Sequence, residues 1–438
     1  MFKKKIIIVG GSIAGCTSAV LLQRLGADVI ILERSSGVIT NQGFGITLPT
    51  TIIQQCTALD LFDHDIPQLP ISGRSFSRTE DDEQNMRTFW KQPINASALN
   101  WNHVYQNLRS RIQSNTYYPN TEVRSIKKID NIYHLTTATG ITYQADLVIA
   151  ADGVNSTVRK QILPEVYPKN SGYVAWRGLV KIPTAMQQSI FNEHVPYCVF
   201  PQGHILLYAI PDKNHQQTGD TLLNWVLYEN LQENLSGDLL PDNLKTQPIY
   251  SLAPNSITTS HRDHLRALAQ IALPANIAAL VCETQSISMQ AVVDFKLPEY
   301  PDNQCIFVGD AAATLRPHTA SGVFKALTNG IELATIFKAG YDRIHEITDQ
   351  WKKKQQLAIT EEVQKAKAMG DALVMHPPNW IDMDHASADA WWACVMQGKT
   401  WYATKLAAVP IHLNKYSIFK PANQPLNDNK TYPFYPKL

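Results

Sequence analysis

The alternation of apolar runs and polar breaks predicts a strand, a helix and a second strand near the N-terminus. Residues 6–9 are an unbroken apolar run, and the stretch GGSIAG follows directly. In residues 14–25 apolar positions recur at helical spacing until Gly26 ends the pattern. Residues 29–32 form a second apolar run that is closed by Glu33. This order predicts a βαβ unit with a glycine-rich turn after its first strand.

Later patterns predict elements of both kinds. Apolar positions three and four residues apart predict a helix at about 101–112, and the Ile-, Thr- and Tyr-rich stretch 123–143 predicts a hairpin. The apolar run 147–151 is typical of a strand buried in a parallel sheet. Residues 305–313 predict a buried strand, followed by a helix that runs to about Phe337.

Residues 173–295 have a different pattern. Short alternating segments such as YVAWRGLVKI and TLLNWVLYEN are separated by Pro, Gly, Asn and Asp. They are typical of an antiparallel sheet, and their position within the chain predicts a second domain inserted into the first. From about residue 342 the chain is predicted to be helical, and its proline-containing end is predicted to be an extended tail.

Composition narrows the classes of protein. The 438 residues are long enough for two or three domains, and 39 Lys and Arg against 38 Asp and Glu give a formal net charge of +1. This balance argues against a nucleic-acid partner or an anionic membrane surface. No apolar run approaches the roughly 18 residues that span a bilayer. Six scattered cysteines, without a CxxC pair or a cysteine–histidine cluster, predict free thiols, a reducing cytoplasmic compartment and no metal site.

The glycine turn has the features of a dinucleotide site. Gly10 is placed for the tight turn and Gly15 for close packing of the helix on the strand, and the helix N-terminus offers free N–H groups to a pyrophosphate. Glu33 is placed to accept hydrogen bonds from ribose hydroxyls. Ser12 stands at the second glycine position of the motif, and its hydroxyl can donate to phosphate. The other residues predicted to bind the cofactor here are Gly11, Ile13, Ala14 and Arg34.

A bacterial lipoprotein signal is an alternative interpretation of the same segment. Residues 3–5 are lysines, and the stretch IAGC ends at Cys16. The apolar core of a signal needs about 7 to 15 residues, whereas Gly10 and Gly11 interrupt this one. Cleavage before Cys16 would also remove the first strand of the βαβ unit. A glycine turn with a purely structural role is the third possibility.

A second motif follows the apolar run at 147–151. The sequence ADLVIAADGVNSTVRKQI delivers Asp152 and Gly153 to a turn after the strand. Ser156 is placed to cap a short helix that carries Arg159. The motif therefore predicts a second strand-to-helix junction beside the first.

A third motif lies in CIFVGDAAATLRPHTASGVFKALTNGIELA. Gly309 and Asp310 follow a buried strand, where a carboxylate can accept hydrogen bonds from a polyol. Gly322 and Val323 lie near the start of the next helix. A glycine there lets backbone N–H groups approach a ligand, and the helix dipole favours negative charge. These residues predict the third side of one cofactor site.

The three motifs, in this order, resemble those of the group A FAD-dependent aromatic hydroxylases, which have the p-hydroxybenzoate hydroxylase fold. Within that family the chain is most similar to the 2,6-dihydroxypyridine 3-hydroxylase branch, over about residues 5–340. The segments RPHTASGVFKA, YVAWRG and NWVLYEN carry the closer likeness. Two positions depart from the family pattern: Trp101 replaces an arginine that contacts the flavin, and Ala313 replaces a common histidine.

The resemblance implies an α/β fold with a Rossmann-like FAD-binding domain, an inserted, mainly antiparallel β-sheet substrate domain and a helical C-terminal region. The expected boundaries are 1–72, 96–172 and 296–341 for the FAD-binding domain, 73–95 and 173–295 for the substrate domain, and 342–438 for the C-terminal region with its tail.

The resemblance also implies the chemistry. NAD(P)H, as a transient co-substrate, would reduce FAD, and O₂ would add to form a flavin C4a-hydroperoxide. Its distal oxygen would pass to a small electron-rich aromatic or N-heteroaromatic substrate, such as a hydroxypyridine or a phenol. Because the cofactor carries this chemistry, the absence of a catalytic triad motif is expected.

Site residues follow from the same resemblance. Gly45 and Ile46 match the segment over the isoalloxazine. Arg316, Pro317 and His318 lie next to the expected flavin edge. Arg316 or His318 would steady a peroxide or a phenolate-like substrate, although an ion pair is an equal possibility for Arg316. The candidates for substrate contact on the second domain, each also compatible with a core position, are His204, Tyr208 and Trp225.

Other functions fit the motifs less well. A flavin monooxygenase that tailors a larger natural product or inactivates a drug, and a non-catalytic flavin-binding protein, both remain alternatives. The WxWxIP signature of flavin-dependent halogenases is absent. A plain NAD-dependent dehydrogenase leaves the Asp152 and Asp310 motifs unexplained. The C-terminal region is a possible surface for a homodimer.

Overall fold

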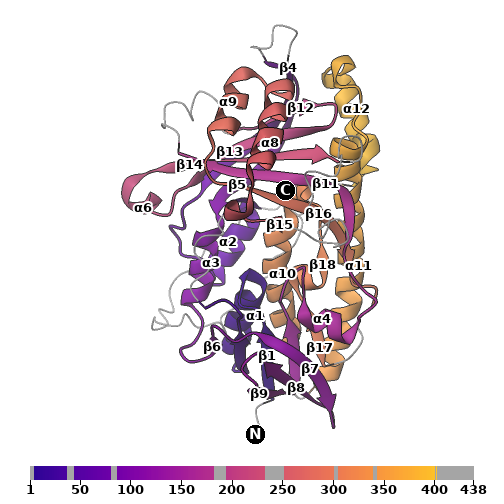
Figure 1. Cartoon of the computed structure of the whole chain (residues 1–438). Helices are drawn as coiled ribbons and strands as arrows, with labels where there is room; N and C mark the ends of the chain where they lie inside the picture. Colours follow the sequence, from indigo (N-terminus) through magenta and orange to yellow (C-terminus); the bar gives the residue numbers. More distant parts are fainter. Residues whose placement is uncertain are drawn as a thin grey trace, which may run out of the picture.

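A parallel sheet forms the centre of one half of the molecule, at the bottom of Figure 1. The computed structural model describes residues 4–36, 44–79, 86–181, 194–231, 251–299, 304–338, 343–399 and 401. Strand β1 lies in the middle of this sheet and pairs in parallel on both sides. The strand order is β17 (Cys305–Phe307), β10 (Leu147–Ala150), β1 (Lys5–Val9), β2 (Asp28–Leu32) and β6 (Tyr117–Tyr118).

Both faces of the parallel sheet are covered, which explains its unbroken apolar strands. Ile6 and Ile8 pack among helices on one face, and Ile7 and Val9 pack on the other face towards a three-stranded sheet. The helices of the first face are α1 (Ile13–Arg24), α2 (Thr50–Ala58), α3 (Trp101–Ser110) and α10 (Ser321–Phe337). The elements of the second face are β7 (Val123–Ile129), β8 (Ile132–Thr137), β9 (Thr142–Ala145) and α4 (Thr157–Ile162).

A large, mainly antiparallel sheet forms the upper half of the molecule (Figure 1). Its pairs are antiparallel except for β12 with β4. The strand order is β15 (Ser251–Leu252), β16 (Ile287–Lys296), β11 (Lys169–Val180), β14 (Thr221–Asn230), β13 (Gly203–Pro211), β12 (His194–Phe200), β4 (Leu69–Thr79), β5 (Met86–Asn100) and β3 (Gly45–Pro49), and β18 (Ala313–Thr314) pairs with β16.

The two faces of this sheet pack against different partners. Leu223, Trp225 and Leu227 of β14 belong to a cluster with helices α8 (Thr259–Ala272) and α9 (Ala275–Glu283), whereas Val226 and Tyr228 point to the opposite face. The alternating pattern predicted the strands, but it did not predict these two helices within 173–295. Their buried apolar residues, among them Leu265 and Val281, contact the sheet, whereas Ile271 of α8 is exposed.

The C-terminal helices run along both halves on the right of Figure 1. In α11 (Ile344–Gly370), Trp351 is fully buried against the helices that cover the parallel sheet, and the π-helical turn Asp371–Met375 then packs on the second sheet. Helix α12 (His385–Met396) covers β5. The remaining short elements are α6 (His215–Thr218) and the 3₁₀ turns Pro254–Ser256, Gly309–Ala311, Pro317–Thr319 and Trp380–Asp382.

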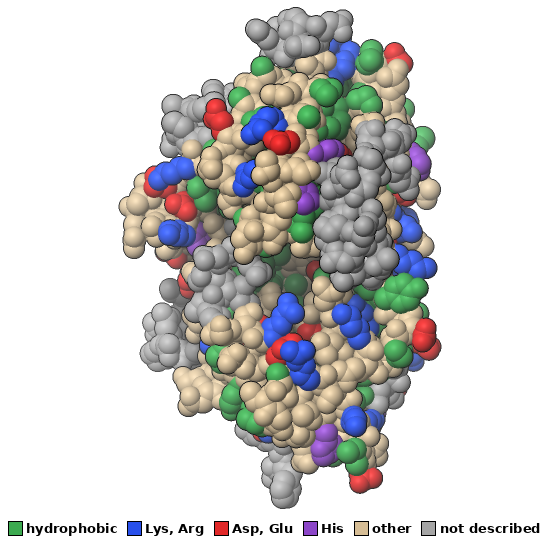
Figure 2. Space-filling model, viewed as in Figure 1, with side chains coloured by type: hydrophobic (Ala, Val, Ile, Leu, Met, Phe, Trp, Pro, Cys, Tyr) green, Lys and Arg blue, Asp and Glu red, His purple; other side chains and the backbone are tan. Residues whose placement is uncertain are grey.

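The predicted fold class is confirmed: a Rossmann-like parallel-sheet domain, a mainly antiparallel second domain and C-terminal helices. The domain boundaries stay predictions, and the predicted tail lies outside the described residues. None of the described helices is both long and apolar enough to cross a membrane. All six cysteines are free thiols. Figure 2 shows acidic and basic side chains interspersed over one face, in line with the near-zero net charge.

Candidate active site

The glycine turn after β1 is held by backbone contacts that exclude side chains. Gly10 has a φ of +99°, and its N–H donates to the Leu32 carbonyl at 2.9 Å. A Cβ on Gly15 would lie 2.0 Å from the Gly10 carbonyl oxygen. Glu33 accepts hydrogen bonds from the N–H groups of Gly11 and Ser35, at 2.7 and 2.8 Å. The turn, the start of α1 and the acidic residue therefore meet as predicted.

Ser12 caps α1 without using its hydroxyl. Its backbone is extended, and its side chain makes no capping hydrogen bond to the helix. The half-buried hydroxyl thus stays available beside the free N–H groups of a helix N-terminus, an arrangement that favours phosphate. Arg34 is exposed just beyond Glu33. The residues of this segment fit the diphosphate of FAD.

The Asp152 motif is tied to the Asp310 motif by Arg159. Ser156 caps α4 by accepting from the Arg159 N–H at 3.0 Å. The buried Arg159 side chain donates to the carbonyls of Ala311 and Val154, and it lies over the Phe295 ring at 4.2 Å. All of these contacts are internal, so Arg159 acts by holding the two motifs together. One oxygen of Asp152, Oδ1, is buried without a hydrogen-bond partner among the described residues.

The Asp310 motif is supported by α10. The Gly309 N–H donates to Asn329 Oδ1 at 2.9 Å, and Asn329 in turn donates to Gln355 of α11. Asp310 Oδ1 is 2.8 Å from the ammonium of Lys325, which also donates to the Ala313 carbonyl. The Asp310 side chain is 47% exposed whereas that of Lys325 is 9% exposed. The lysine therefore fixes a carboxylate that remains accessible to a ligand.

The open space beside Gly322, at the N-terminus of α10, shows whether a large cofactor can fit there. A Cβ added to Gly322 would meet no protein atom within 4 Å, although the helix begins one residue earlier. A cofactor edge can therefore approach the first N–H groups of α10 closely. Together with the free Ser12 hydroxyl and the half-exposed Asp310, this opening fits FAD lying from α1 to α10.

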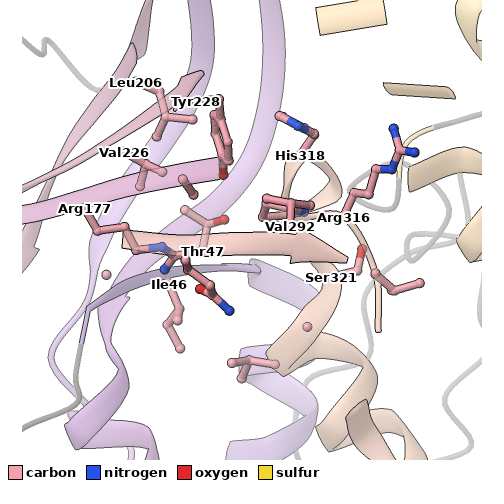
Figure 3. A pocket seen from close by; sticks show the side chains of 18 of the residues that line it. Ile46, Thr47, Arg177, Leu206, Val226, Tyr228, Val292, Arg316, His318 and Ser321 are labelled. Atoms are coloured by element: carbon pink, nitrogen blue, oxygen red, sulfur yellow. The ribbon is translucent and has the colours of Figure 1, made fainter. Parts of the chain in front are cut away.

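One cavity of about 310 Å³ connects these cofactor residues with the second sheet. Figure 3 shows side chains of β3, β11, β13, β14 and β16 facing the 316–321 segment across it. Of the cofactor residues, its walls include Gly45, Ile46, Asp310, Gly322 and Val323. Its sheet side is formed mainly by apolar and aromatic residues, among them Ile71, Ala175, Val195, Leu206, Tyr208, Val226, Tyr228 and Val292. The space can hold a small ring next to the cofactor.

His318 lies at the edge of the cavity in a cluster of rings. Its Nε2 is 2.9 Å from the Tyr173 hydroxyl, and its ring centroid is 4.4 Å from that of Tyr228. Nδ1 is buried without a hydrogen-bond partner among the described residues. Burial, with His204 and Arg316 nearby, holds the pKa of His318 well below its ordinary value. The imidazole is therefore neutral at physiological pH and able to accept a hydrogen bond.

Arg316 is engaged in ion pairs. Its guanidinium lies 2.7 Å from Asp294 and 2.6 Å from Asp371, and these hydrogen bonds raise its pKa despite burial. The ion pairs join β16 to the end of α11 and hold the 3₁₀ turn that begins at Pro317. Arg316 is thus a positioning residue for Pro317 and His318, in accordance with the ion-pair alternative.

The three substrate candidates occupy different places. Tyr208 lines the cavity and packs against Gly45, whose Cβ would lie 2.7 Å from the tyrosine ring. His204 is fully buried behind the wall, where its ring stacks on Tyr197 at 5.4 Å and lies beside His318. Trp225 is buried on the opposite face of the sheet, and its Nε1 donates to Thr284. Strand alternation separates Trp225 from the cavity that Val226 lines.

Several residues of the site were not predicted. Tyr173, Arg177 and Tyr228 come from β11 and β14, and Trp401 reaches the cavity from the C-terminal segment, donating to the Thr319 carbonyl at 3.1 Å. Lys325 lies four residues after Ser321, on the first turns of α10. Of these missed residues, only Arg177 and Lys325 could have been noticed in the sequence, because each is a charged residue inside an otherwise apolar segment.

Comparison with known proteins agrees with this architecture. A model of the FAD binding domain-like family matches residues 170–294. The 2,6-dihydroxypyridine 3-monooxygenase of Paenarthrobacter nicotinovorans is 25% identical over 372 residues, which cover 84% of this chain and 91% of that protein. The 6-hydroxynicotinate 3-monooxygenase of Bordetella bronchiseptica is 22% identical over 350 residues, covering 77% of this chain and 83% of that protein.

Solved structures show the same fold. The 2,6-dihydroxypyridine-3-hydroxylase from Arthrobacter nicotinovorans superposes with a TM-score of 0.76 at 23% identity, covering 87% of this chain and 96% of that one. A salicylate hydroxylase substrate complex has a TM-score of 0.68 at 18% identity, covering 90% and 94%. The resemblance predicted from the three motifs is confirmed.

Proposed function

We propose, from the premise that this chain is an FAD-dependent monooxygenase related to the group A hydroxylases, that it hydroxylates a small electron-rich aromatic or N-heteroaromatic ring. NAD(P)H is the reductant and O₂ the oxygen donor. The observation that carries the proposal is the cavity that joins the Asp310 and Gly322 edge to an aromatic-lined sheet. A volume of about 310 Å³, part of which lies against the cofactor residues, is at the low end of ligand pockets and favours a small substrate.

The cofactor would be held by residues of the first and third motifs, while Arg159 of the second motif supports the third through the Ala311 carbonyl. The glycine turn and Ser12 face the diphosphate, Asp310 faces the ribitol, and the N-terminus of α10 at Gly322 faces the flavin ring. Bound FAD, once reduced, supplies the activation of O₂ and the oxygen atom that enters the ring. The protein contributes orientation, exclusion of water and control of protons.

The chain's own residues account for those contributions. The apolar wall of β13, β14 and β16 excludes water and stacks on the ring. The neutral His318 accepts a hydrogen bond at Nδ1 from a hydroxyl of the substrate, which increases electron density in the ring. Tyr173 bonds the opposite nitrogen and fixes the orientation of the imidazole. Because Nδ1 accepts, the proton of the neutral imidazole is on Nε2, which donates to the Tyr173 hydroxyl.

The proposal is tested by reconstituting the purified protein with FAD and screening hydroxypyridines and phenols. We expect a yellow protein whose NAD(P)H oxidation is stimulated by at least one ring compound, with one ¹⁸O atom from ¹⁸O₂ in the product by mass spectrometry. Stimulation only by bulky polycyclic compounds would support the alternative of a tailoring or drug-inactivating enzyme. Full FAD occupancy with no oxygen incorporation from any compound would support a non-catalytic flavoprotein.

Replacing Lys325 by Met is expected to raise the Kd for FAD about tenfold, because Asp310 loses the charged hydrogen bond that fixes its carboxylate. Asp310→Ala is expected to lose FAD altogether. Flavin fluorescence during titration of the apoprotein measures both values. Lys354→Met is the matched control, since this lysine pairs with Glu332 at 3.2 Å and is 55% exposed. Equal affinity in Lys325→Met and the parent would contradict the role given to Asp310.

A further inference from the structure

Arg177 is the exceptional charge of the cavity. It lies on β11, which is paired on both sides, with Val226 of β14 and Ser288 of β16. Its side chain reaches into the cavity beside Ile46 and Thr47 (Figure 3). The guanidinium is half-buried, and its Nε is fully enclosed without a hydrogen-bond acceptor. Among the described residues it makes no hydrogen bond and no ion pair. Its charge lies over the Phe44 ring at 5.7 Å and near the Tyr228 hydroxyl, where it partly offsets the rise that burial causes in the pKa of that group.

The other charged residues of the cavity wall are neutralised within the protein. Arg316 is paired with Asp294 and Asp371, and Asp310 is paired with Lys325. Enclosing a guanidinium among apolar walls without a partner costs free energy, which proteins avoid unless a ligand supplies the missing charge. Among the described residues of the cavity wall, the Arg177 guanidinium thus remains without an anionic partner, and an anionic ligand could supply one.

We propose that Arg177 binds an anionic oxygen of the ring substrate, either a phenolate-type oxyanion or a ring carboxylate. This inference rests on the proposed function and narrows its substrate class to anionic hydroxylated rings. The planar guanidinium can donate two parallel hydrogen bonds to a carboxylate, or one or two to a single oxyanion. Because β11 is paired on both sides, the charge is held on a rigid element of the sheet.

Binding of an oxyanion at Arg177 also sets the orientation of the substrate, with one end at Arg177 and the other at His318. One oxygen lies at Arg177, on the β3 and β11 side of the cavity, while His318 approaches from the 316–321 segment on the other side (Figure 3). The ring between them packs against Tyr228 and Val226. Arg177 stabilises the ionised form of the substrate directly, so His318 only has to accept a hydrogen bond.

The test uses FAD-loaded protein and four unreactive or slowly reacting probes. Benzoate and benzamide compare a carboxylate with a neutral group of the same shape, and 4-nitrophenolate and nitrobenzene do so for an oxyanion. Dissociation constants come from perturbation of the flavin absorption spectrum. We expect Arg177→Gln to weaken the preferred anion by about 10- to 100-fold and its neutral partner by less than about twofold. Arg177→Lys should restore part of the loss, and the exposed Arg124→Gln should change nothing.

The outcomes separate this inference from the proposed function. A larger loss for benzoate than for 4-nitrophenolate assigns a carboxylate, and the reverse assigns an oxyanion. Equal losses for anionic and neutral probes, or a loss of FAD itself in Arg177→Gln with unchanged probe affinity in the retained holoenzyme, overturn the inference. Either result leaves hydroxylation by the parent protein intact, because that activity is measured independently by oxygen incorporation.

Discussion

Gly322→Ala is expected to leave the protein folded while raising the Kd for FAD by about 10- to 100-fold. The added methyl group meets no protein atom within 4 Å, so the helix itself tolerates it. Alanine is also the better helix former by up to about 1 kcal/mol, so the apoprotein should unfold at the same temperature or slightly higher. The methyl group would instead occupy the space in which the cofactor reaches the N–H groups of α10, and lost charge-assisted hydrogen bonds account for the expected factor.

Gly15→Ala is the matched comparison. Its methyl group would lie 2.0 Å from the Gly10 carbonyl, so the turn itself must move. This variant is expected to lose both FAD and thermal stability. Calorimetric titration of each apoprotein with FAD, together with its melting temperature, distinguishes the two glycines. Parental FAD affinity in Gly322→Ala would show that the cofactor does not approach this helix end.

His318→Asn is expected to lower kcat/KM for hydroxylation by about 100-fold, the lower end of the effect of a positioned proton acceptor. Asparagine is smaller and cannot bind both Tyr173 and a substrate hydroxyl as the imidazole does. Tyr173→Phe should have a smaller effect, since it removes the hydroxyl that orients His318 and leaves Nδ1 in place. Product formed per NAD(P)H consumed should fall in both variants, because the flavin can still be reduced when the ring is not activated.

The pH profile gives His318 a distinct signature. Its pKa is held well below the ordinary value by burial, so the neutral form persists as the pH falls through 6.5. For the parent, kcat/KM should therefore stay level across that value and decline only at lower pH, where protonation removes the acceptor. In His318→Asn this acid decline should disappear. The exposed His345→Gln should behave as the parent, and an unchanged acid limb in His318→Asn would assign it to another group.

The sequence predicted the cofactor half of the site because backbone geometry imposes local requirements. Gly10 must adopt a positive φ, Gly15 must pack against a carbonyl, and Asp310 must follow a strand directly. Each requirement restricts the residue type at one position within a short stretch of sequence, so it can be recognised there. The same locality explains why the bounds expected for α10 and the strand at 147–150 agree closely with the structure.

The substrate half was less predictable because it depends on side-chain direction within a sheet. Trp225 and Val226 are neighbours in sequence, yet one packs under α8 and α9 and the other lines the cavity. Neighbouring strand residues point to opposite faces, and β14 has large apolar residues on both faces, so its sequence does not show which face lines the cavity. Arg177 and Arg316 illustrate the same difficulty. Arg316 pairs with Asp294, whereas Arg177 lies over the Phe44 ring, and the sequence does not show this difference.

The sequence by itself therefore determined the fold class, the family resemblance and the cofactor, all of which depend on short motifs with fixed backbone geometry. Only the tertiary structure decided which charges are neutralised, which ring faces the cavity and how the C-terminal segment contributes Trp401. These properties arise from contacts between residues far apart in the chain, such as Arg316 with Asp371 or Trp401 with Thr319. Such contacts leave no periodic pattern in sequence, because their partners meet only after the domains have packed.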